Sequence, residues 1–272
     1  MKITTLEGTV NFRDVGGLPL AGGGSVASGV LYRSDALSSL TPRGLETLAG
    51  SGVDVLADFR TPAERQMAPN RLPAGRPLRI LELPLFEGAF TGAAQAEMQR
   101  ANLAGDPASA ARAIQAAIAQ LPTLGELYTG MLEDGAPVFA AAARTVAAGN
   151  GSAAVLHCTA GKDRTGVAAA LLLEAAGVER NAVVADYQLS ERNLAGEWSD
   201  RMLGMIAGMG VPLTEAVITL VTRSPADAIV TALDWVTANH GGAAGYLRAA
   251  GLSATELKQL QQRLRGQDPD PH

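Results

Sequence analysis

The residues best suited to carry chemistry lie in one run, residues 157–166, which reads His-Cys-Thr-Ala-Gly-Lys-Asp-Arg-Thr-Gly and holds the only cysteine of the chain. Five residues separate Cys158 from Arg164. A loop of this length can curl so that successive backbone N–H groups point inward, while the guanidinium adds two parallel donors. Such a loop neutralises a phosphate dianion and holds it against sulfur. The spacing therefore predicts attack by a cysteine thiolate on phosphorus.

A strand, a tight loop and a helix are expected to position this run. The apolar residues 153–156 predict a buried strand, and residues 165–176 predict a helix that stops at Gly177. An anion in the loop would then lie at a helix N-terminus, where free N–H groups and the macrodipole favour negative charge. The same field lowers a thiol pKa from about 8.5 into the range of roughly 3.5 to 7.5. We predict that Cys158 is a reactive thiolate at neutral pH.

Roles within the run follow from the chemistry of each group. Cys158 is expected to form a phosphocysteine, and Arg164 to hold two equatorial oxygens of the phosphoryl group. Asp163 is the nearest carboxyl in sequence and is assigned as general acid, then as the base that activates water; the alternative is a structural carboxylate bonded to loop N–H groups. The phosphate-binding residues are expected to be Thr159, Ala160, Gly161, Lys162, Asp163 and Arg164.

Three neighbouring side chains are expected to support the loop. Lys162 suits a second phosphate or a multiply charged head group, or is a solvated charge at the rim. The Thr165 hydroxyl either donates to the sulfur or caps the helix. His157 points away from the nucleophile and is interpreted as a scaffold residue that orients the loop by hydrogen bonding.

Other uses of a cysteine or of this loop are less consistent with the sequence. One cysteine and the scattered histidines His157, His240 and His272 show no metal-ligand spacing, so no metal is expected. A nucleotide-binding Walker loop would need glycine at position 156 and serine or threonine at position 163, where the chain has leucine and aspartate. Papain-like catalysis would need a histidine from elsewhere as base. A sulfurtransferase fits poorly with Arg164 and an anion-sized loop.

The run resembles the phosphate-binding loop of the bacterial and fungal tyrosine phosphatases known as the tyrosine/serine protein phosphatase family. Further blocks in the same order extend the resemblance over nearly the whole chain: residues 11–17, 31–38, 58–65, 184–187 and 245–253. The resemblance implies dual specificity, phosphoinositide hydrolysis in some members, and the loop aspartate, here Asp163, as general acid. In agreement, the chain contains no Trp-Pro-Asp sequence of the kind that supplies a mobile acid in eukaryotic tyrosine phosphatases.

The pattern of apolar segments predicts an α/β fold. The resemblance implies a single-domain cysteine-phosphatase fold over residues 1–266, with a central, mostly parallel sheet flanked by helices. Further strands are predicted at 29–33, 53–59 and 80–85, with a helix that begins at Thr41-Pro42. Helices are also expected at 127–132 and 137–146, before the strand that carries Cys158.

Several arginines and carboxylates outside the loop are secondary candidates. The predicted strand 53–59 brings Arg60 to its C-terminal end, the edge where α/β sheets bind ligands. Arg60 and Arg65 are expected either to act at the site, by lining the pocket or pairing with loop carboxylates, or to form structural ion pairs. The same alternatives apply to Arg13 and Asp14. Glu87 is a weaker alternative to Asp163 as the acid.

Three segments stand apart from the predicted body of the domain. Residues 88–120, rich in Ala and Gln, are interpreted as a helical insertion. Residues 196–223 carry methionines at helical spacing and correspond to a lid in a member of the family, although ordinary core helices would give the same pattern. The polar, proline-rich residues 267–272 are expected to be disordered.

Composition limits the partners and the compartment. The net charge of −5 and pI near 5.3 argue against nucleic acid, and a single cysteine excludes an intrachain disulfide. No segment is apolar over the length of a signal peptide or of a membrane span. We expect no stable membrane insertion, and either a cytoplasmic protein or one exported without a cleaved signal peptide.

Together these patterns predict a phosphatase acting on phosphotyrosine, with phosphoserine and phosphothreonine as further substrates, through a phosphocysteine and without any metal or organic cofactor. Its partners would be a phosphorylated protein or a phosphoinositide, with phosphate or another oxyanion in the site. A dedicated phosphoinositide phosphatase is the alternative enzyme. A phosphate-reading binding module that lacks turnover is the alternative outside enzymes.

Overall fold

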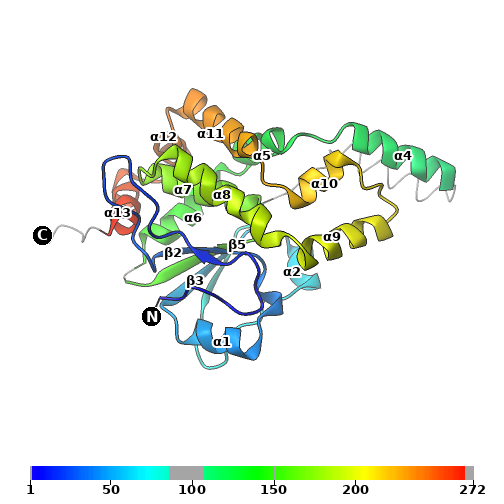
Figure 1. The fold of residues 1–272 in the computed structure, drawn as a ribbon. Helices are drawn as coiled ribbons and strands as arrows, with labels where there is room; N and C mark the ends of the chain where they lie inside the picture. Colours follow the sequence, from blue (N-terminus) through cyan, green and yellow to red (C-terminus); the bar gives the residue numbers. More distant parts are fainter. Residues whose placement is uncertain (1, 86–106, 150, 267–272) are drawn as a thin grey trace, which may run out of the picture.

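The computed structural model describes residues 2–85, 107–149 and 151–266, and Figure 1 shows the arrangement of their helices and strands. One sheet contains five strands in the order β1-β2-β5-β3-β4. Only the β1–β2 pair is antiparallel. The mostly parallel sheet predicted from the sequence is therefore confirmed. The strands are β1 (Arg13–Asp14), β2 (Leu31–Ser34), β3 (Val53–Asp58), β4 (Arg79–Glu82) and β5 (Ala153–His157).

Helices cover both faces of this sheet, with α1 on one side and α7 and α8 on the other (Figure 1). The 3₁₀ turn η1 (Leu37–Ser39) follows β2. The helices are α1 (Pro42–Ala49), α2 (Pro62–Met67), α4 (Pro107–Ala119), α5 (Leu124–Asp134), α6 (Ala136–Ala147), α7 (Arg164–Ala175), α8 (Arg180–Leu194), α9 (Glu197–Gly208), α10 (Glu215–Thr222), α11 (Ala226–His240), α12 (Ala243–Ala249) and α13 (Ala254–Arg265).

The alternation of side chains along the strands explains the two covered faces. In β5, Ala154 and Leu156 join the larger core beneath α7, whereas Ala153 and Val155 join a second core that includes Leu48 of α1. Successive residues of a strand point to opposite faces, so a strand buried on both sides is apolar throughout. Truncating such a core side chain to alanine costs about 2–5 kcal/mol. β5 is thus firmly held on both sides, and so is the residue that follows it.

The strand register brings the ends of three strands to one edge. His157, the last residue of β5, is aligned with Ser34 of β2 and with Asp58 of β3. The chain leaves β5 at Cys158, between the segments that follow β2 and β3. This is the carboxyl edge at which parallel α/β sheets bind ligands.

Local sequence signals fix several helix starts. Thr41 caps α1, with Pro42 as its first residue, as predicted. Thr61 and Glu64 form a capping box at α2, which the sequence analysis did not single out as a helix. At α11 the N-cap residue is Pro225, and no side chain caps the start of the helix.

The segments set apart by the sequence are only partly described. Of the expected insertion 88–120, α4 is described, and the residues up to 106 lie outside the described residues, as do Glu87 and the tail 267–272. Residues 196–223 contain α9 and α10, which contact each other and extend from the side of the molecule opposite α13 (Figure 1). Within the described ranges, no single helix has the length and apolarity to cross a membrane, although the bent pair α10 and α11 meets both criteria jointly.

Candidate active site

Cys158 lies directly after the central strand, with a side chain only 1% exposed. The backbone N–H of Gly161 donates to its Sγ at 3.2 Å. This return of the chain requires a φ of +68° at Gly161, and a Cβ there would lie 2.4 Å from the carbonyl oxygen of Ser34. Only glycine fits both conditions. The predicted turn of the loop around the sulfur is therefore present in the structure.

Donors from outside the loop hold its carbonyl groups outward. Ala36 N–H donates to the carbonyl of Thr159 at 3.1 Å, and Asn11 Nδ2 to that of Ala160 at 2.9 Å. An Arg33 Nη donates to the carbonyl of Gly161 at 2.9 Å. A peptide whose carbonyl is held outward presents its N–H to the inside. The carbonyl groups of residues 159–161 are thus all bound by groups from other segments of the chain.

The side chain of Arg33 is anchored by Asp186 on α8, which also binds Arg13. Asp186 accepts from Arg33 at 2.6 Å and from Arg13 at 2.7 Å. Burial opposes the charge on Asp186, but the two arginines outweigh it and lower its pKa. Burial and the neighbouring Arg33 lower the pKa of Arg13 to about 10. Arg13 stays charged at neutral pH and supports the loop through Asp186 and Asn11 rather than by reaching the sulfur.

Asp14 does not join this network. Its two carboxylate oxygens accept from the backbone N–H groups of Gly16 and Gly29, at 2.8 and 2.7 Å. Those bonds order the turns that lead into β2. Asp14 accordingly orders the backbone, a role that differs from the ion pair expected from the sequence.

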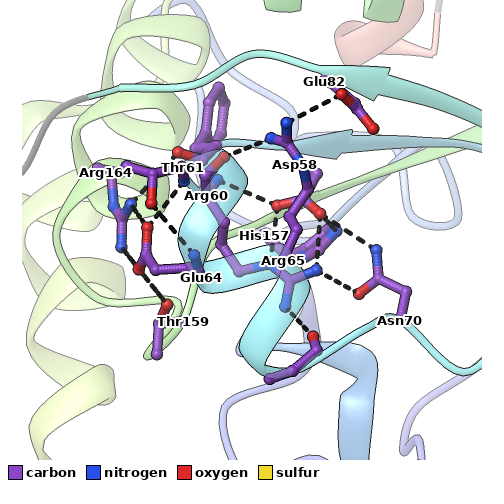
Figure 2. A network of polar contacts seen from close by, with 12 residues as sticks. Asp58, Arg60, Thr61, Glu64, Arg65, Asn70, Glu82, His157, Thr159 and Arg164 are labelled. Carbon is purple, nitrogen blue, oxygen red and sulfur yellow. Dashed lines mark hydrogen bonds and ion pairs between the residues drawn. The ribbon is translucent and has the colours of Figure 1, made fainter.

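Arg164, at the start of α7, is clamped by Glu64 of α2 (Figure 2). Its terminal nitrogens donate to the two Glu64 oxygens at 2.7 and 2.8 Å. The Thr159 hydroxyl donates to the same carboxylate at 2.5 Å. Partial burial opposes ionisation of Glu64, but the hydrogen bonds and charge of Arg164 lower its pKa to about 2. The guanidinium is therefore oriented by a full negative charge.

Arg60 belongs to a separate cluster next to this clamp (Figure 2). It makes paired hydrogen bonds to Asp58 at 2.9 and 2.7 Å, and it also contacts the carbonyl of Ala68 and the side chain of Asn70. Of the two expectations for Arg60, the structural ion pair is the one observed. Arg65 likewise binds the Arg60 carbonyl and Glu82. Neither arginine lines the hollow that opens over the loop. Their N–H groups instead donate to carboxylate and carbonyl oxygens in the segments around β3.

His157 differs from expectation. Its ring is fully buried on the far side of the strand from Cys158, 3.6 Å from Asp58 Oδ2. Among the described residues, neither ring nitrogen makes a hydrogen bond. Burial lowers the pKa of His157 to about 4, so the ring is neutral at pH 7. The expectation that His157 orients the loop by side-chain hydrogen bonds is wrong, because strand alternation turns the ring away from the loop.

Asp163 faces two buried tyrosines and a lysine. Tyr128 of α5 donates its hydroxyl to Asp163 Oδ1 at 2.5 Å, and Lys162 Nζ lies 2.9 Å from the same oxygen. The hydroxyl of Tyr187, on α8, is 2.7 Å from that of Tyr128. The alternative in which loop N–H groups bind this carboxylate is not observed, since these side chains hold it instead.

Lys162 is not a solvated rim charge, because its side chain is 1% exposed. Besides Asp163, its ammonium donates to the carbonyl oxygens of Leu220 and Arg223 at 2.8 and 3.0 Å. These carbonyls end α10, where the last turn of a helix has no partners of its own and the macrodipole favours a cation. The ammonium group thus makes two hydrogen bonds and one ion pair.

Thr165 is fully buried in the first turn of α7. Within the described ranges its hydroxyl makes no hydrogen bond, either to the sulfur or to a helix N–H. The N-cap residue of α7 is Asp163, whose side chain does not cap. The structure therefore assigns Thr165 neither of the two roles expected from the sequence.

A hollow of about 230 Å³ opens over the loop. Its floor contains Thr159, Ala160 and Asp163, with Glu64 beside them. Its apolar walls come from α5, α9 and α10, namely Leu127, Trp198, Met202, Ile206, Leu220 and Val221. A polar floor under apolar walls suits an anion carried on an apolar group.

Sequence reasoning missed several residues that shape this site. Glu64 and Asp186 were visible only as members of similar blocks, and Tyr128 was not singled out. Their partners, Arg164, Arg33 and Asp163, lie 100, 153 and 35 positions away. The one local signal was the capping box Thr61–Glu64, which marks a helix start and says nothing of Arg164.

The site thus combines a buried thiol after the central strand, an amide directed at its sulfur and an arginine at the start of the next helix. The profile of the tyrosine phosphatase family matches residues 4–266. The chain belongs to this family, as its resemblance predicted.

Three bacterial relatives agree with this assignment. A Cupriavidus necator protein named as a tyrosine-protein phosphatase is 36% identical over 241 residues, which cover 88% of this chain and 81% of that protein. A tyrosine-protein phosphatase of Nostoc commune is 31% identical over 88% of this chain and 76% of its own length. The triple specificity protein phosphatase PtpB of Mycobacterium tuberculosis is 29% identical over 98% of this chain and its whole length.

Proposed function

We propose that this protein hydrolyses phosphotyrosine in proteins through a covalent phosphocysteine. The observation that carries the proposal is the amide of Gly161 directed at Cys158 Sγ inside a loop that Arg164 closes. A backbone donor stabilises the thiolate, and an arginine complements the charge of a phosphoryl group. The family assignment supports the same reaction class.

In the first step the Cys158 thiolate attacks phosphorus. The S–P bond forms as the P–O bond to the phenol breaks, and Asp163 gives its proton to the departing oxygen. In the second step water attacks phosphorus and passes a proton to Asp163. The S–P bond breaks, and inorganic phosphate and the thiolate are released. Arg164 and the loop amides stabilise the charge on the phosphoryl oxygens in both transition states.

The walls of the hollow support phosphotyrosine as the principal substrate. Trp198, Leu220 and the other apolar walls give a phenyl ring an apolar environment directly above Asp163. Burying about 100 Å² of ring surface contributes about 2.5 kcal/mol at 25 cal/mol per Å². Phosphoserine and phosphothreonine lack the ring and leave as more basic alkoxides, so we propose slower turnover for both. The name of the mycobacterial relative records activity on more than one phosphate ester class for that protein.

The phosphoinositide alternative relied on Lys162 as a ligand for a second phosphate. Here the Lys162 ammonium donates to the carbonyl oxygens of Leu220 and Arg223 and forms an ion pair with Asp163. To bind another phosphate, Lys162 would have to give up one of these partners. This favours phosphoprotein over phosphoinositide substrates.

We also propose that residues 196–223 act as a lid. Helices α9 and α10 supply most of the apolar wall above the loop, and the end of α10 is joined to the loop through Lys162. Substrate entry and product release would then require the apolar wall to move, while Lys162 holds the end of α10 to the loop.

The function is tested with p-nitrophenyl phosphate, a phosphotyrosine peptide, phosphoserine and phosphothreonine peptides, and a phosphoinositide. Cys158→Ser and Arg164→Ala should each lower kcat/KM by about a thousandfold or more, which is about 4 kcal/mol of transition-state stabilisation. Asp163→Asn should cost most with alkyl phosphates. Arg144→Ala, which removes a half-exposed arginine on α6, is the control for loss of an arginine.

Single-turnover quenching of the wild type should trap phosphorus on the cysteine. Substantial turnover by Cys158→Ser would refute the mechanism. Faster hydrolysis of the phosphoinositide than of the phosphotyrosine peptide would overturn the substrate assignment and leave the mechanism intact.

A further inference from the structure

Two buried tyrosines form an unexpected extension of the site, on the side of Asp163 that faces away from the hollow. Tyr128 and Tyr187 are fully buried, and their rings meet edge to face, with centroids 5.9 Å apart. Gly166 makes room for this arrangement, since a Cβ there would come within 3.1 Å of the Tyr187 ring. Neither tyrosine lines the hollow above the loop. Their hydroxyls must therefore act, if at all, through Asp163.

The hydrogen bonds among the two tyrosines and Asp163 run in one direction, from Tyr187 to Tyr128 and from Tyr128 to the carboxylate. Burial and the negative charge of Asp163 hold the pKa of Tyr128 well above its usual value, and burial does the same for Tyr187, so both phenols stay protonated at working pH. Each phenol has a single proton to donate. Tyr128 donates its one hydroxyl proton to Asp163 Oδ1. Its oxygen therefore accepts the hydrogen bond from the Tyr187 hydroxyl. The hydroxyl oxygen of Tyr128 lies 2.5 Å from Oδ1, at the short end of the range for hydrogen bonds between oxygens.

Lys162 excludes the reverse direction. If Oδ1 carried a proton and donated it to Tyr128, that proton would lie beside the Lys162 ammonium, which is itself 2.9 Å from Oδ1 and can only donate. Two donors thus converge on Oδ1. No hydrogen bond reaches Oδ2 from the residues that the structure describes. The two oxygens of Asp163 are therefore chemically distinct.

We propose that Tyr128, backed by Tyr187, is a positioning residue that fixes Oδ1 of Asp163 and leaves Oδ2 as the atom that carries the catalytic proton. This inference rests on the proposed role of Asp163 as general acid. Oδ2 gives its proton to the leaving-group oxygen in the first step and takes one from water in the second. The phenols exchange no proton with substrate. Their effect is to prevent rotation of the carboxyl, which would otherwise present either oxygen.

The test compares substrates whose leaving groups differ in basicity. For Tyr128→Phe we expect kcat/KM to fall about tenfold or more with alkyl phosphates, in line with loss of one hydrogen bond to a charged group, and to change less than threefold with p-nitrophenyl phosphate. Tyr187→Phe should give a smaller loss of the same kind, because Tyr128 keeps its own proton. Inhibition by inorganic phosphate should not change, since the phosphate-binding loop is intact in both variants.

A double-mutant cycle separates positioning from general stability. In the Asp163→Asn background, Tyr128→Phe should have no further effect on alkyl phosphate hydrolysis. The matched control is Tyr246→Phe, which removes a buried hydroxyl bonded to the Leu132 carbonyl at 2.6 Å, remote from the site. This control should lower thermal stability without changing the leaving-group dependence. Should Tyr128→Phe fold poorly, Tyr187→Phe supplies the same comparison.

Two results would overturn the inference alone: an equal loss by Tyr128→Phe on every substrate, or an undiminished loss in the Asp163→Asn background. Wild-type rates for Asp163→Asn on alkyl phosphates would instead refute Asp163 as the acid, and the role of the tyrosines with it. Turnover by Cys158→Ser would refute the proposed function as a whole.

Discussion

Glu64 holds both terminal nitrogens of Arg164, so the guanidinium that follows the Cys158 loop is fixed by a carboxylate from a different segment of the chain. Arg164 is 1% exposed and Glu64 is 30% exposed. A buried guanidinium without such a partner is costly, about 3–5 kcal/mol when one member of a buried pair is removed. The solvent contact of Glu64 reduces that figure here.

The first prediction concerns this clamp. Glu64→Ala should lower kcat/KM about tenfold or more and reduce the melting temperature, because Arg164 loses its orientation and its counter-charge. For Glu64→Gln, both kcat/KM and the melting temperature should lie between the values of Glu64→Ala and the wild type. Steady-state kinetics and thermal denaturation measure both effects. Tighter inhibition by phosphate or vanadate in Glu64→Ala would contradict the prediction, since Glu64 would then act as a competing anion.

A second prediction concerns Asp186, which joins Arg33 and Arg13 behind the loop. Asp186→Asn should destabilise the protein by about 3–5 kcal/mol, because two largely buried cations lose their counter-charge. Urea denaturation measures the change. Asp234→Asn is the control, since it removes a carboxylate that is 67% exposed from its pair with Arg180 and should cost less than about 1 kcal/mol. Equal losses of unfolding free energy in the two variants would show that the buried ion pairs of Asp186 stabilise the protein no more than an exposed pair does.

The third prediction is a pH dependence of stability caused by Asp35. Burial raises its pKa to about 6, against the opposing effect of hydrogen bonds from the N–H groups of Asn11 and Val10. A raised carboxyl pKa favours folding at low pH, and that stabilisation is lost as the pH rises through about 6. The free energy of unfolding of Asp35→Asn, minus that of the wild type, should therefore increase by about 2 kcal/mol between pH 4 and pH 7.

Urea titrations of both proteins at several pH values measure this difference. His157, whose pKa is lowered to about 4, changes stability in the opposite sense over the same window. It is present in both proteins, so its effect cancels in the comparison. A difference that stays constant from pH 4 to pH 7 would show that Asp35 titrates at its ordinary value.

The fourth prediction concerns Lys162 and the end of α10. Lys162→Met keeps the length of the side chain but removes the donors to Leu220, Arg223 and Asp163. Amide exchange in residues 215–223 should accelerate, because the last turn of α10 loses its cation. Hydrolysis of phosphotyrosine and phosphoinositide should fall by similar factors. A loss confined to phosphoinositide would instead assign Lys162 to a second phosphate.

Local signals were enough to predict much of the fold and the centre of the site. The apolar run before Cys158 predicted β5, the Thr41-Pro42 pair predicted the start of α1, and the loop composition predicted the turn that brings Gly161 N–H to the sulfur. In each case neighbours in sequence determine the conformation. The two-residue strand β1 escaped prediction because two residues show no periodicity.

The roles of individual charges could not be predicted in this way. Arg60 and Arg164 both follow buried strands, yet Arg60 pairs with Asp58 two positions before it, and Arg164 pairs with Glu64. The same holds for Lys162, which the sequence placed either on a phosphate or in solvent. Its actual partners are carbonyls of a helix 58 and 61 positions further along. Contacts of this kind depend on how the helices pack, and no local pattern encodes them.

The outward-facing carbonyls of the loop have a consequence for refolding. The donors that hold them come from Asn11 and Arg33, which lie 149 and 128 positions away in the chain. Contacts between such distant segments form late, because closing long loops is entropically costly. During refolding, hydrolytic activity should accordingly return after the helical circular dichroism signal, so the rate at which turnover recovers is a kinetic probe of the last native contacts.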